Sequence, residues 1–222
     1  MAEPRNDVVV RSFTGGVFAE NSYLLVCTAS NAAIVVDPGA GTPQMLAEAR
    51  RLGVNVQSIV LTHAHIDHVE GLAQAKEETG APIYLHPDDA ELYRNAPLQA
   101  QWFGLQMDPL PPVDHPLVPG ESVRFGECEL AVRFAPGHAP GHVILVGDGV
   151  AMVGDVIFNG SIGRTDLPGG DLQTLMRSIR EQVLTLPDAT TLHTGHGPDT
   201  TVGHERVSNP FLTGSFGGSR FA

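Results

Sequence analysis

Short apolar runs that are rich in β-branched side chains occupy the first forty positions of the chain. Runs of this length, bounded by Gly, Asn and Ser, predict β-strands rather than helices. We therefore expect three strands near the N-terminus, at 8–13, 22–27 and 32–37. The apolar spacing then changes to that of a helix over 42–53. Thr42 can cap this helix, Pro43 fits its first turn and Gly53 can end it.

Strands and helices alternate from there to the middle of the chain. The pattern predicts a strand at 58–63, a helix near 69–80, a strand at 82–86 and a helix from Pro87 to Arg94. The next stretch, 96–120, is rich in proline and has no clear period, so we expect an irregular loop. Its apolar residues either line a pocket or, in the simpler interpretation that we adopt, pack on the core; they are Trp102, Phe103, Leu105 and Met107.

The last part of the chain repeats the order of strands followed by helices. Short strands are expected over 122–155 and a further strand over 190–195. The clearest helical spacing lies at 171–186, where Asp171 can act as the N-cap. Two halves of similar length and similar order favour two sheets with helices outside, within one domain over 1–222. We interpret 213–222 as a tail that is flexible or docks on a neighbouring molecule.

Composition excludes several classes of protein. Hydrophobic residues make up 42% of the chain and charged residues 17%, which suits a folded core and excludes wholesale disorder. A net charge of −12 argues against a nucleic-acid partner and against an anionic membrane surface. The charged start, MAEPRNDVVV, is unlike a secretory signal, and no apolar run is long enough to span a membrane. We therefore expect a cytoplasmic protein.

The two cysteines, Cys27 and Cys128, lie 101 positions apart and form no CxxC pair. In a cytoplasmic chain this spacing favours two buried, reduced thiols over a disulfide.

Four side chains that can bind metal stand together in the segment THAHIDH (62–68), directly after the apolar run SIVL. A loop at the end of a strand can turn several of them toward one point. Imidazole and carboxylate groups suit Zn, Fe and Mn, which need ligand atoms at about 2.0–2.2 Å. The sequence therefore predicts a metal site formed by His63, His65, Asp67 and His68.

HAHIDH resembles the HxHxDH signature of the metallo-β-lactamase fold superfamily. Four further motifs occur in the order of that superfamily, and they are VVDPG (35–39), PGH (136–138), VGDVIF (153–158) and TGHG (194–197). The five motifs extend over most of the chain. The resemblance implies an α/β fold of layered type: an αββα sandwich in which two mixed β-sheets pack together and helices cover the outer faces.

The resemblance also implies two adjacent metal positions. The ligands of the first position would be His63, His65 and His138. The ligands of the second would be Asp67, His68 and His196. Asp155 would bridge the two metals, opposite a shared water or hydroxide.

Two neighbouring residues have weaker assignments. Asp37 would orient a ligand imidazole through a hydrogen bond, although a turn-forming role explains Asp37 equally well. His142 lies in the repeat PGHAPGH, but the superfamily places its ligand in the first PGH, so we expect His142 to pack or to hydrogen-bond to the site. We expect the same of His193, and ordinary surface or core positions for His86, His115 and His204.

Such a centre suits hydrolysis. Two divalent ions, with Zn first and Fe or Mn as alternatives, lower the pKa of a bridging water from about 15.7 toward about 7. They also stabilise the oxyanion that forms as a carbonyl is attacked. Asp67 and Asp155 are the predicted catalytic carboxylates, and the chain carries no GxSxG nucleophile motif.

The segment NGSIGRTDLPGGDL (159–172) resembles the short bacterial form of the glyoxalase II enzymes, the hydroxyacylglutathione hydrolases. Arg164 would meet a substrate carboxylate, with the backbone of Gly163 and Thr165 nearby; the alternative is a structural arginine paired with Asp166 or Asp171. The longer members of that family carry a C-terminal helical domain with basic residues, and a Tyr after GHG. Neither occurs in this chain, which has a single lysine, Lys76.

We therefore expect a glyoxalase II-type thioesterase for a small thioester, and S-D-lactoylglutathione is the model for a glutathione-derived substrate. A mononuclear iron persulfide dioxygenase is the first alternative, because it needs only His63, His138 and Asp155. A lactonase or other ester hydrolase on the same dimetal core is the second. The sequence does not indicate an oligomeric state.

Overall fold

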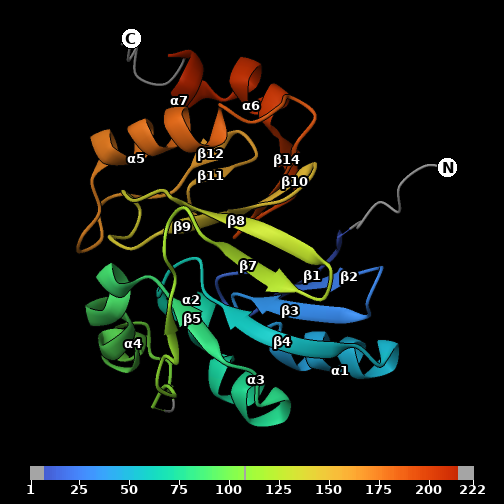
Figure 1. Cartoon of the computed structure of the whole chain (residues 1–222). Coiled ribbons are helices and arrows are strands. Elements are labelled where there is room, and N and C mark those ends of the chain that lie inside the picture. Colours follow the sequence, from blue (N-terminus) through green and yellow to red (C-terminus); the bar gives the residue numbers. More distant parts are fainter. Residues whose placement is uncertain (1–7, 108, 215–222) are drawn as a thin grey trace, which may run out of the picture.

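Neighbouring residues of strand β2 (Glu20–Cys27) point to opposite faces of a sheet, and both faces are buried. Leu24 packs in a cluster with helical residues, whereas Leu25 packs against a second sheet. This burial explains why the strand has a continuous apolar run instead of an alternating one. The computed structural model describes residues 8–107 and 109–214, and in these the two sheets lie face to face between two layers of helices (Figure 1).

The first sheet contains the N-terminal half of the chain. Its strands follow the order of the sequence, and they are β1 (Val8–Gly15), β2, β3 (Ala32–Val36), β4 (Asn55–Val60), β5 (Ile83–Leu85) and β6 (His115–Pro116). The pairs from β1 to β3 are antiparallel and the pairs from β3 to β6 are parallel, so the sheet is mixed.

The second sheet contains the C-terminal half and is also mixed. Its strands, in spatial order, are β14 (Thr200–Thr201), β13 (Thr191–Thr194), β10 (Val150–Gly154), β9 (Val143–Val146), β8 (Cys128–Phe134) and β7 (Ser122–Phe125). The pair of β10 with β13 is parallel and the other pairs are antiparallel. A small hairpin of β11 (Ile157–Phe158) and β12 (Ser161–Ile162) follows β10.

Helices cover the outer face of each sheet. The first sheet carries α1 (Thr42–Leu52), α2 (Ile66–Val69), α3 (Leu72–Thr79), the 3₁₀ turn η1 (Pro87–Asp89) and α4 (Ala90–Trp102). The second carries α5 (Leu172–Ser178), which continues as the π-helical turn η2 (Ile179–Val183), and then α6 (Val202–Ser208) and α7 (Pro210–Thr213). The predicted αββα sandwich is thereby confirmed (Figure 1).

Most predicted elements are present, with shifted ends. Asp171 caps α5 by accepting a hydrogen bond from the Thr174 amide at 2.7 Å, as expected. Gly53 ends α1 with a φ of 64°, also as expected. The N-cap of α1 is Gly41 rather than Thr42, whose hydroxyl instead donates to the Gly39 carbonyl at 2.7 Å.

The largest error concerns the stretch after Arg94. Helix α4 continues to Trp102, so residues 96–102 are helical and the predicted irregular loop begins only after them. Pro97 lies inside this helix and misled the prediction. Buried Leu92, Ala96 and Ala100 form an apolar stripe at helical spacing, and its packing outweighs the loss of one backbone hydrogen bond.

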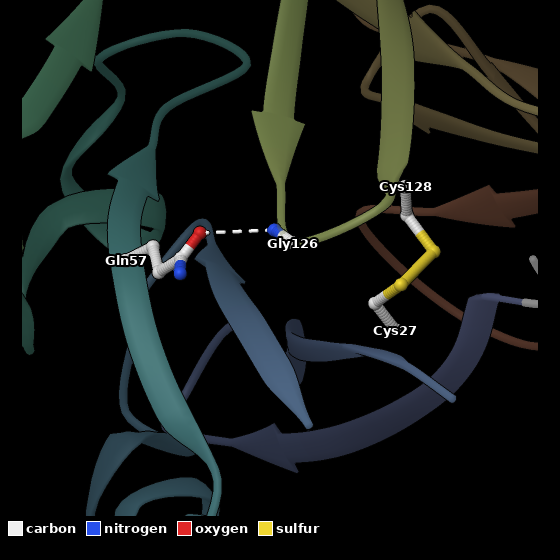
Figure 2. Close-up of a disulfide and its surroundings, with 4 residues drawn as sticks. All are labelled: Cys27, Gln57, Gly126 and Cys128. Atoms are coloured by element: carbon white, nitrogen blue, oxygen red, sulfur yellow. Dashed lines mark hydrogen bonds between the residues drawn. A yellow bond between two sulfur atoms is a disulfide. The ribbon is translucent and has the colours of Figure 1, made fainter. Parts of the chain in front are cut away.

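The two cysteines are joined, so the prediction of reduced thiols is wrong. Cys27 ends β2 and Cys128 begins β8, and their Cα atoms lie 5.7 Å apart across the gap between the sheets (Figure 2). The sheets also meet nearby, where the Gly126 amide donates to the Gln57 side chain at 3.0 Å. Separation along the sequence hid this pairing, because it depends on how the two sheets pack.

None of the helices in the described ranges is both long enough and apolar enough to cross a bilayer. Of the predicted tail, 213–222, the last eight residues lie outside the described ranges.

Candidate metal centre

Strands from both sheets end at one edge of the sandwich. Histidines or an aspartate follow β4, β8, β10 and β13 within four residues of the strand end. Two backbone contacts tie the sheets together at this edge: the Val143 amide donates to the Thr62 carbonyl at 2.9 Å, and Glu20 pairs with His196 in an antiparallel bridge. Loops that are far apart in sequence are therefore held side by side.

The first predicted ligand group is assembled. His63, His65 and His138 each offer one ring nitrogen, and these atoms lie within 4.8 Å of one another. His65 Nδ1 lies 2.7 Å from His138 Nε2. All three rings are buried, with at most 7% of each residue exposed.

The second predicted group is assembled beside it. Ligand atoms of Asp67, His68 and His196 also lie within 4.8 Å of one another. His196 Nε2 is 3.2 Å from Asp67 Oδ2. His68 and Asp67 belong to α2, a helix of one turn that begins immediately after His65. This turn allows consecutive residues of HAHIDH to face two different groups.

Asp155 lies between the two groups. Its carboxylate is 3.4 Å from His138 Nε2, which belongs to the first group. It is also 3.3 Å from His68 Nε2 and 3.5 Å from His196 Nε2, which belong to the second. This is the location that a bridging carboxylate requires.

Backbone carbonyls hold the outer nitrogens of two of these histidines. His138 Nδ1 donates to the Arg164 carbonyl at 2.8 Å, and His196 Nδ1 donates to the Phe18 carbonyl at 3.0 Å. Each bond keeps a proton on Nδ1 and directs Nε2 at the cluster, so Nε2 is the nitrogen that can bind a metal once it carries no proton. Metal-binding histidines in proteins are oriented in this way.

Asp37 holds two more rings. Its Oδ2 lies 3.1 Å from His68 Nδ1 and accepts a bond from the Thr62 hydroxyl at 2.6 Å. The same hydroxyl oxygen is 3.1 Å from His63 Nδ1, so it can accept a hydrogen bond from that nitrogen and orient the His63 ring. Asp37 thus occupies the position from which it would orient ligand imidazoles.

The donor set fits divalent cations. His63 Nε2 and His65 Nε2 are buried and have no hydrogen-bond partner anywhere in the described ranges. A buried polar atom without a partner costs free energy, so such atoms call for an explanation. Imidazole nitrogens directed at one point, beside carboxylates, form the ligand chemistry of Zn, Fe and Mn.

Burial keeps the first group neutral. It lowers the pKa of His63 well below its usual value, lowers that of His65 to about 3, and lowers that of His138. Neutral imidazole is the form that coordinates a metal, so these rings need lose no proton to bind one.

The second group behaves differently. Burial alone lowers the pKa of His196, but hydrogen bonds to Asp155 and Asp67 outweigh it and raise the pKa to about 10. Burial likewise opposes protonation of His68, yet Asp155 and Asp67 raise its pKa well above the usual value. Without a metal, these carboxylates therefore hold protons on the two rings, and a cation has to displace them.

His142 stays outside both groups. Its Nε2 accepts a hydrogen bond from the Asp155 amide at 3.1 Å, and its ring stacks on His63 with a centroid distance of 4.7 Å. The expected supporting role of His142 agrees with this geometry. His193 Nδ1 lies 2.9 Å from Asp199 Oδ2, away from the cluster.

Two buried carboxylates near the centre were missed in the sequence. Asp89 Oδ2 accepts from the Ala64 amide at 2.9 Å and its Oδ1 accepts from the Gly141 amide, so Asp89 links the loop of His63 and His65 to the loop of His138. No local motif marks this residue.

Glu20 is the second missed residue, and it is fully buried. It packs against Gly39, where the Cβ of any other residue would collide with the Glu20 carboxylate and the Asp67 carbonyl. The available signal was a charged residue shortly before the apolar run that begins at Tyr23.

The predicted substrate segment has mixed outcomes. Arg164 forms a bidentate pair with Asp166 at 2.7 and 2.8 Å, which is the structural alternative, yet it also lines the cavity above the cluster. Only glycine fits at position 163, because the Cβ of any other residue would collide with the Asp155 carbonyl oxygen. The Thr165 carbonyl packs closely against Gly170, and Thr165 is absent from the cavity lining.

A cavity of about 330 Å³ lies directly above the candidate metal centre. Its floor contains His65, Asp67, His138, Asp155 and His196. Trp102 and Phe103 line it as well, so the pocket alternative is correct for these two residues. Leu105 and Met107 pack on the core instead, as the simpler interpretation expected.

Comparisons with known proteins agree with this geometry. The family model described as "Metallo-beta-lactamase superfamily" matches residues 15–196. The chain is 39% identical over 199 residues to the hydroxyacylglutathione hydrolase GloC of Haemophilus influenzae, covering 88% of this chain and 93% of that protein.

Two solved structures are similar throughout. TTHA1623, described in a di-iron-bound form, is 40% identical with a TM-score of 0.83, covering 91% of this chain and all of the other. The BLEG-1 B3 metallo-β-lactamase is 34% identical with a TM-score of 0.86, covering 92% of this chain and all of the other. The fold, the five motifs and these matches lead to one conclusion: the chain belongs to the metallo-β-lactamase superfamily.

Proposed function

We propose that this protein is a thioester hydrolase of the glyoxalase II type, which cleaves glutathione thioesters such as S-D-lactoylglutathione. The observation that carries the proposal is the pair of ligand groups that meet at Asp155 on the floor of a cavity. Similarity to GloC, along nearly the whole of both chains, supports the thioester as the substrate class.

His63, His65 and His138 would hold one divalent ion, and Asp67, His68 and His196 a second, with Asp155 shared between them. Ions bound there would supply hydroxide near neutral pH and positive charge for the developing oxyanion. Zn, Fe and Mn all suit this donor set.

The residues around the ions have separate tasks. Asp67 faces the cavity and accepts a hydrogen bond from an attacking water, which aims the water at the thioester carbon. Phe158 and Ile162 line the same cavity and exclude bulk water from the carbonyl. The leaving thiolate has a conjugate pKa of about 8.5, so no strong general acid is needed.

Arg164 is the candidate contact for a substrate carboxylate. Its guanidinium is exposed at the cavity rim, so a carboxylate can reach it without entering the core. Asp166 already occupies both arms of the fork and weakens this attraction. The contact therefore contributes modestly to affinity.

The experiment is a pair of assays on the metal-loaded protein. Release of free thiol from S-D-lactoylglutathione tests the hydrolase, and oxygen uptake with glutathione persulfide tests the dioxygenase alternative, which needs only His63, His138 and Asp155. We expect thiol release without oxygen uptake. Oxygen uptake without thiol release, together with one iron per chain, would overturn the proposal. Asp155→Asn serves as the matched inactive control.

A further inference from the structure

The cavity above the candidate metal centre is apolar apart from its floor. Away from the cluster itself, Gln99 and Arg164 are the polar side chains among its described lining residues. Arg164 is paired with Asp166, and the single lysine of the chain, Lys76, is paired with Asp114 at 2.8 Å. The walls thus offer little to a charged group and much to an apolar one.

Aromatic side chains form one part of this wall. Phe18 and Phe103 meet edge to face, with ring centroids 5.3 Å apart at 85°. Trp102 precedes Phe103 at the end of α4 and also lines the cavity. We call these three residues the aromatic wall.

The aromatic wall is joined to the metal centre. The Phe18 carbonyl accepts the hydrogen bond from His196 Nδ1, so Phe18, a member of the wall, also contacts a predicted ligand. Phe158 adds a fourth ring, edge to face with His196 at 5.8 Å. A group bound at the wall is therefore held next to the reacting carbonyl.

Two of the three residues of the wall are open to water. Trp102 is 67% exposed and Phe103 is 51% exposed, which is unusual for side chains of this size. Exposed aromatic surface at the rim of a cavity is typical of a ligand contact. Because much of the surface of Trp102 and Phe103 faces water, its burial by a substrate would gain apolar contact.

We infer that the acyl group of the substrate carries an aromatic ring, which packs on the aromatic wall while the thioester lies over the metal centre. This inference rests on the proposed function and goes beyond it, since a lactoyl group has only a methyl group at that position. A cavity of about 330 Å³ is near the small end of ligand pockets, ~300–1,000 Å³, so it has room for one aromatic acyl group beside the metal centre.

The kinetic test compares two thioesters that differ by phenyl against methyl, S-D-mandeloylglutathione and S-D-lactoylglutathione. We expect kcat/KM to favour the mandeloyl compound by about tenfold or more. Phe103→Ala and Trp102→Ala should each reduce this preference by about tenfold. Leu98→Ala is the matched control, because Leu98 is 55% exposed on the same helix but does not line the cavity, and it should keep the preference. Equal kcat/KM values in the wild type, or a preference that survives both wall substitutions, would overturn the inference.

A binding test is independent of catalysis. Trp102 is the single tryptophan in the chain, so selectively excited tryptophan fluorescence reports on the wall. We expect D-mandelate to change this fluorescence at a concentration at least about tenfold lower than D-lactate, and Phe103→Ala to remove the difference. If neither thioester is cleaved but D-mandelate is still preferred, the proposed function fails and the aromatic preference holds. If the lactoyl compound is cleaved and both acids behave alike, the proposed function holds and the preference fails.

Discussion

At one end of the sandwich, strands of both sheets run into loops that gather buried histidines and aspartates, whereas at the other end a disulfide joins the same two sheets. Strand β2 reaches both ends, with Glu20 beside the cluster and Cys27 in the disulfide. The two residues are seven positions apart along the strand, which is about 23 Å.

The two ends differ in how their polar atoms are satisfied. At the disulfide end, the Gly126 amide and the Gln57 side chain bond to each other. At the cluster end, ring nitrogens of His63 and His65 stay buried without a partner in the described part of the chain. Functional sites commonly break local rules of stability in this way, while the rest of the fold supplies the stability. Substitutions at the two ends should therefore have separable effects.

The largest effect is expected from Asp155→Ala. Loss of the shared carboxylate should remove metal from both positions and lower kcat/KM by at least about 10³-fold. Metal content and thiol release measure the two consequences together. A variant that keeps two metals and full activity would contradict the bridging position of Asp155.

Removal of the disulfide at the opposite end should lower stability and leave activity nearly unchanged. Replacing both Cys27 and Cys128 by Ser should lower the free energy of unfolding by about 2–4 kcal/mol, because the unfolded chain regains the freedom of a long loop. Catalysis should change by less than about twofold. Denaturant unfolding with and without reductant measures the effect, and reduced wild type should match the double variant. A large loss of kcat would show that the two ends are coupled.

Asp89 gives a smaller, pH-dependent effect. Burial raises the pKa of Asp89 to about 6, above the unfolded value of about 3.9. The folded state therefore holds the proton more tightly, and the stability that Asp89 contributes is greatest below pH 4 and falls as the pH rises to 6. The difference in unfolding free energy between the metal-free wild type and Asp89→Asn should shrink over this interval, by about 1.4 kcal/mol per pKa unit. A difference that is constant with pH would contradict the burial of an ionisable group there.

The smallest effect is expected at the rim. Arg164→Ala should raise KM by about three- to tenfold and leave kcat nearly unchanged, since the contact is made equally in the ground state and transition state. Asp166→Asn is the matched variant, because it releases the guanidinium and should lower KM. If neither variant changes KM, Arg164 has a structural role only.

Local motifs made the cluster predictable from the sequence. His63, His65 and His68 stand within six positions of one another after an apolar strand, and the structure does bring them together with His138 and His196. Asp37 was also predictable from the sequence, because it follows a buried strand in an Asp-Pro-Gly turn. In each case the motif that supports the prediction is only a few residues long.

Features that depend on distant contacts were not predictable. Asp89 bonds to amides 25 and 52 positions away, and the disulfide joins residues 101 positions apart. The extent of α4 was hidden by Pro97, whose local preference is outweighed by the buried stripe that packs on the first sheet. Tertiary packing decides all three, and a single sequence carries no direct record of it.

We expect the two metal positions to act together in thioester cleavage. Metal-free protein should be titrated with Zn²⁺, and in parallel with Mn²⁺ and Fe²⁺, while thiol release from a glutathione thioester is followed. We expect activity with the effective metal to rise until two equivalents per chain are bound. Full activity at one equivalent, or no thiol release with any of the three metals, would contradict it.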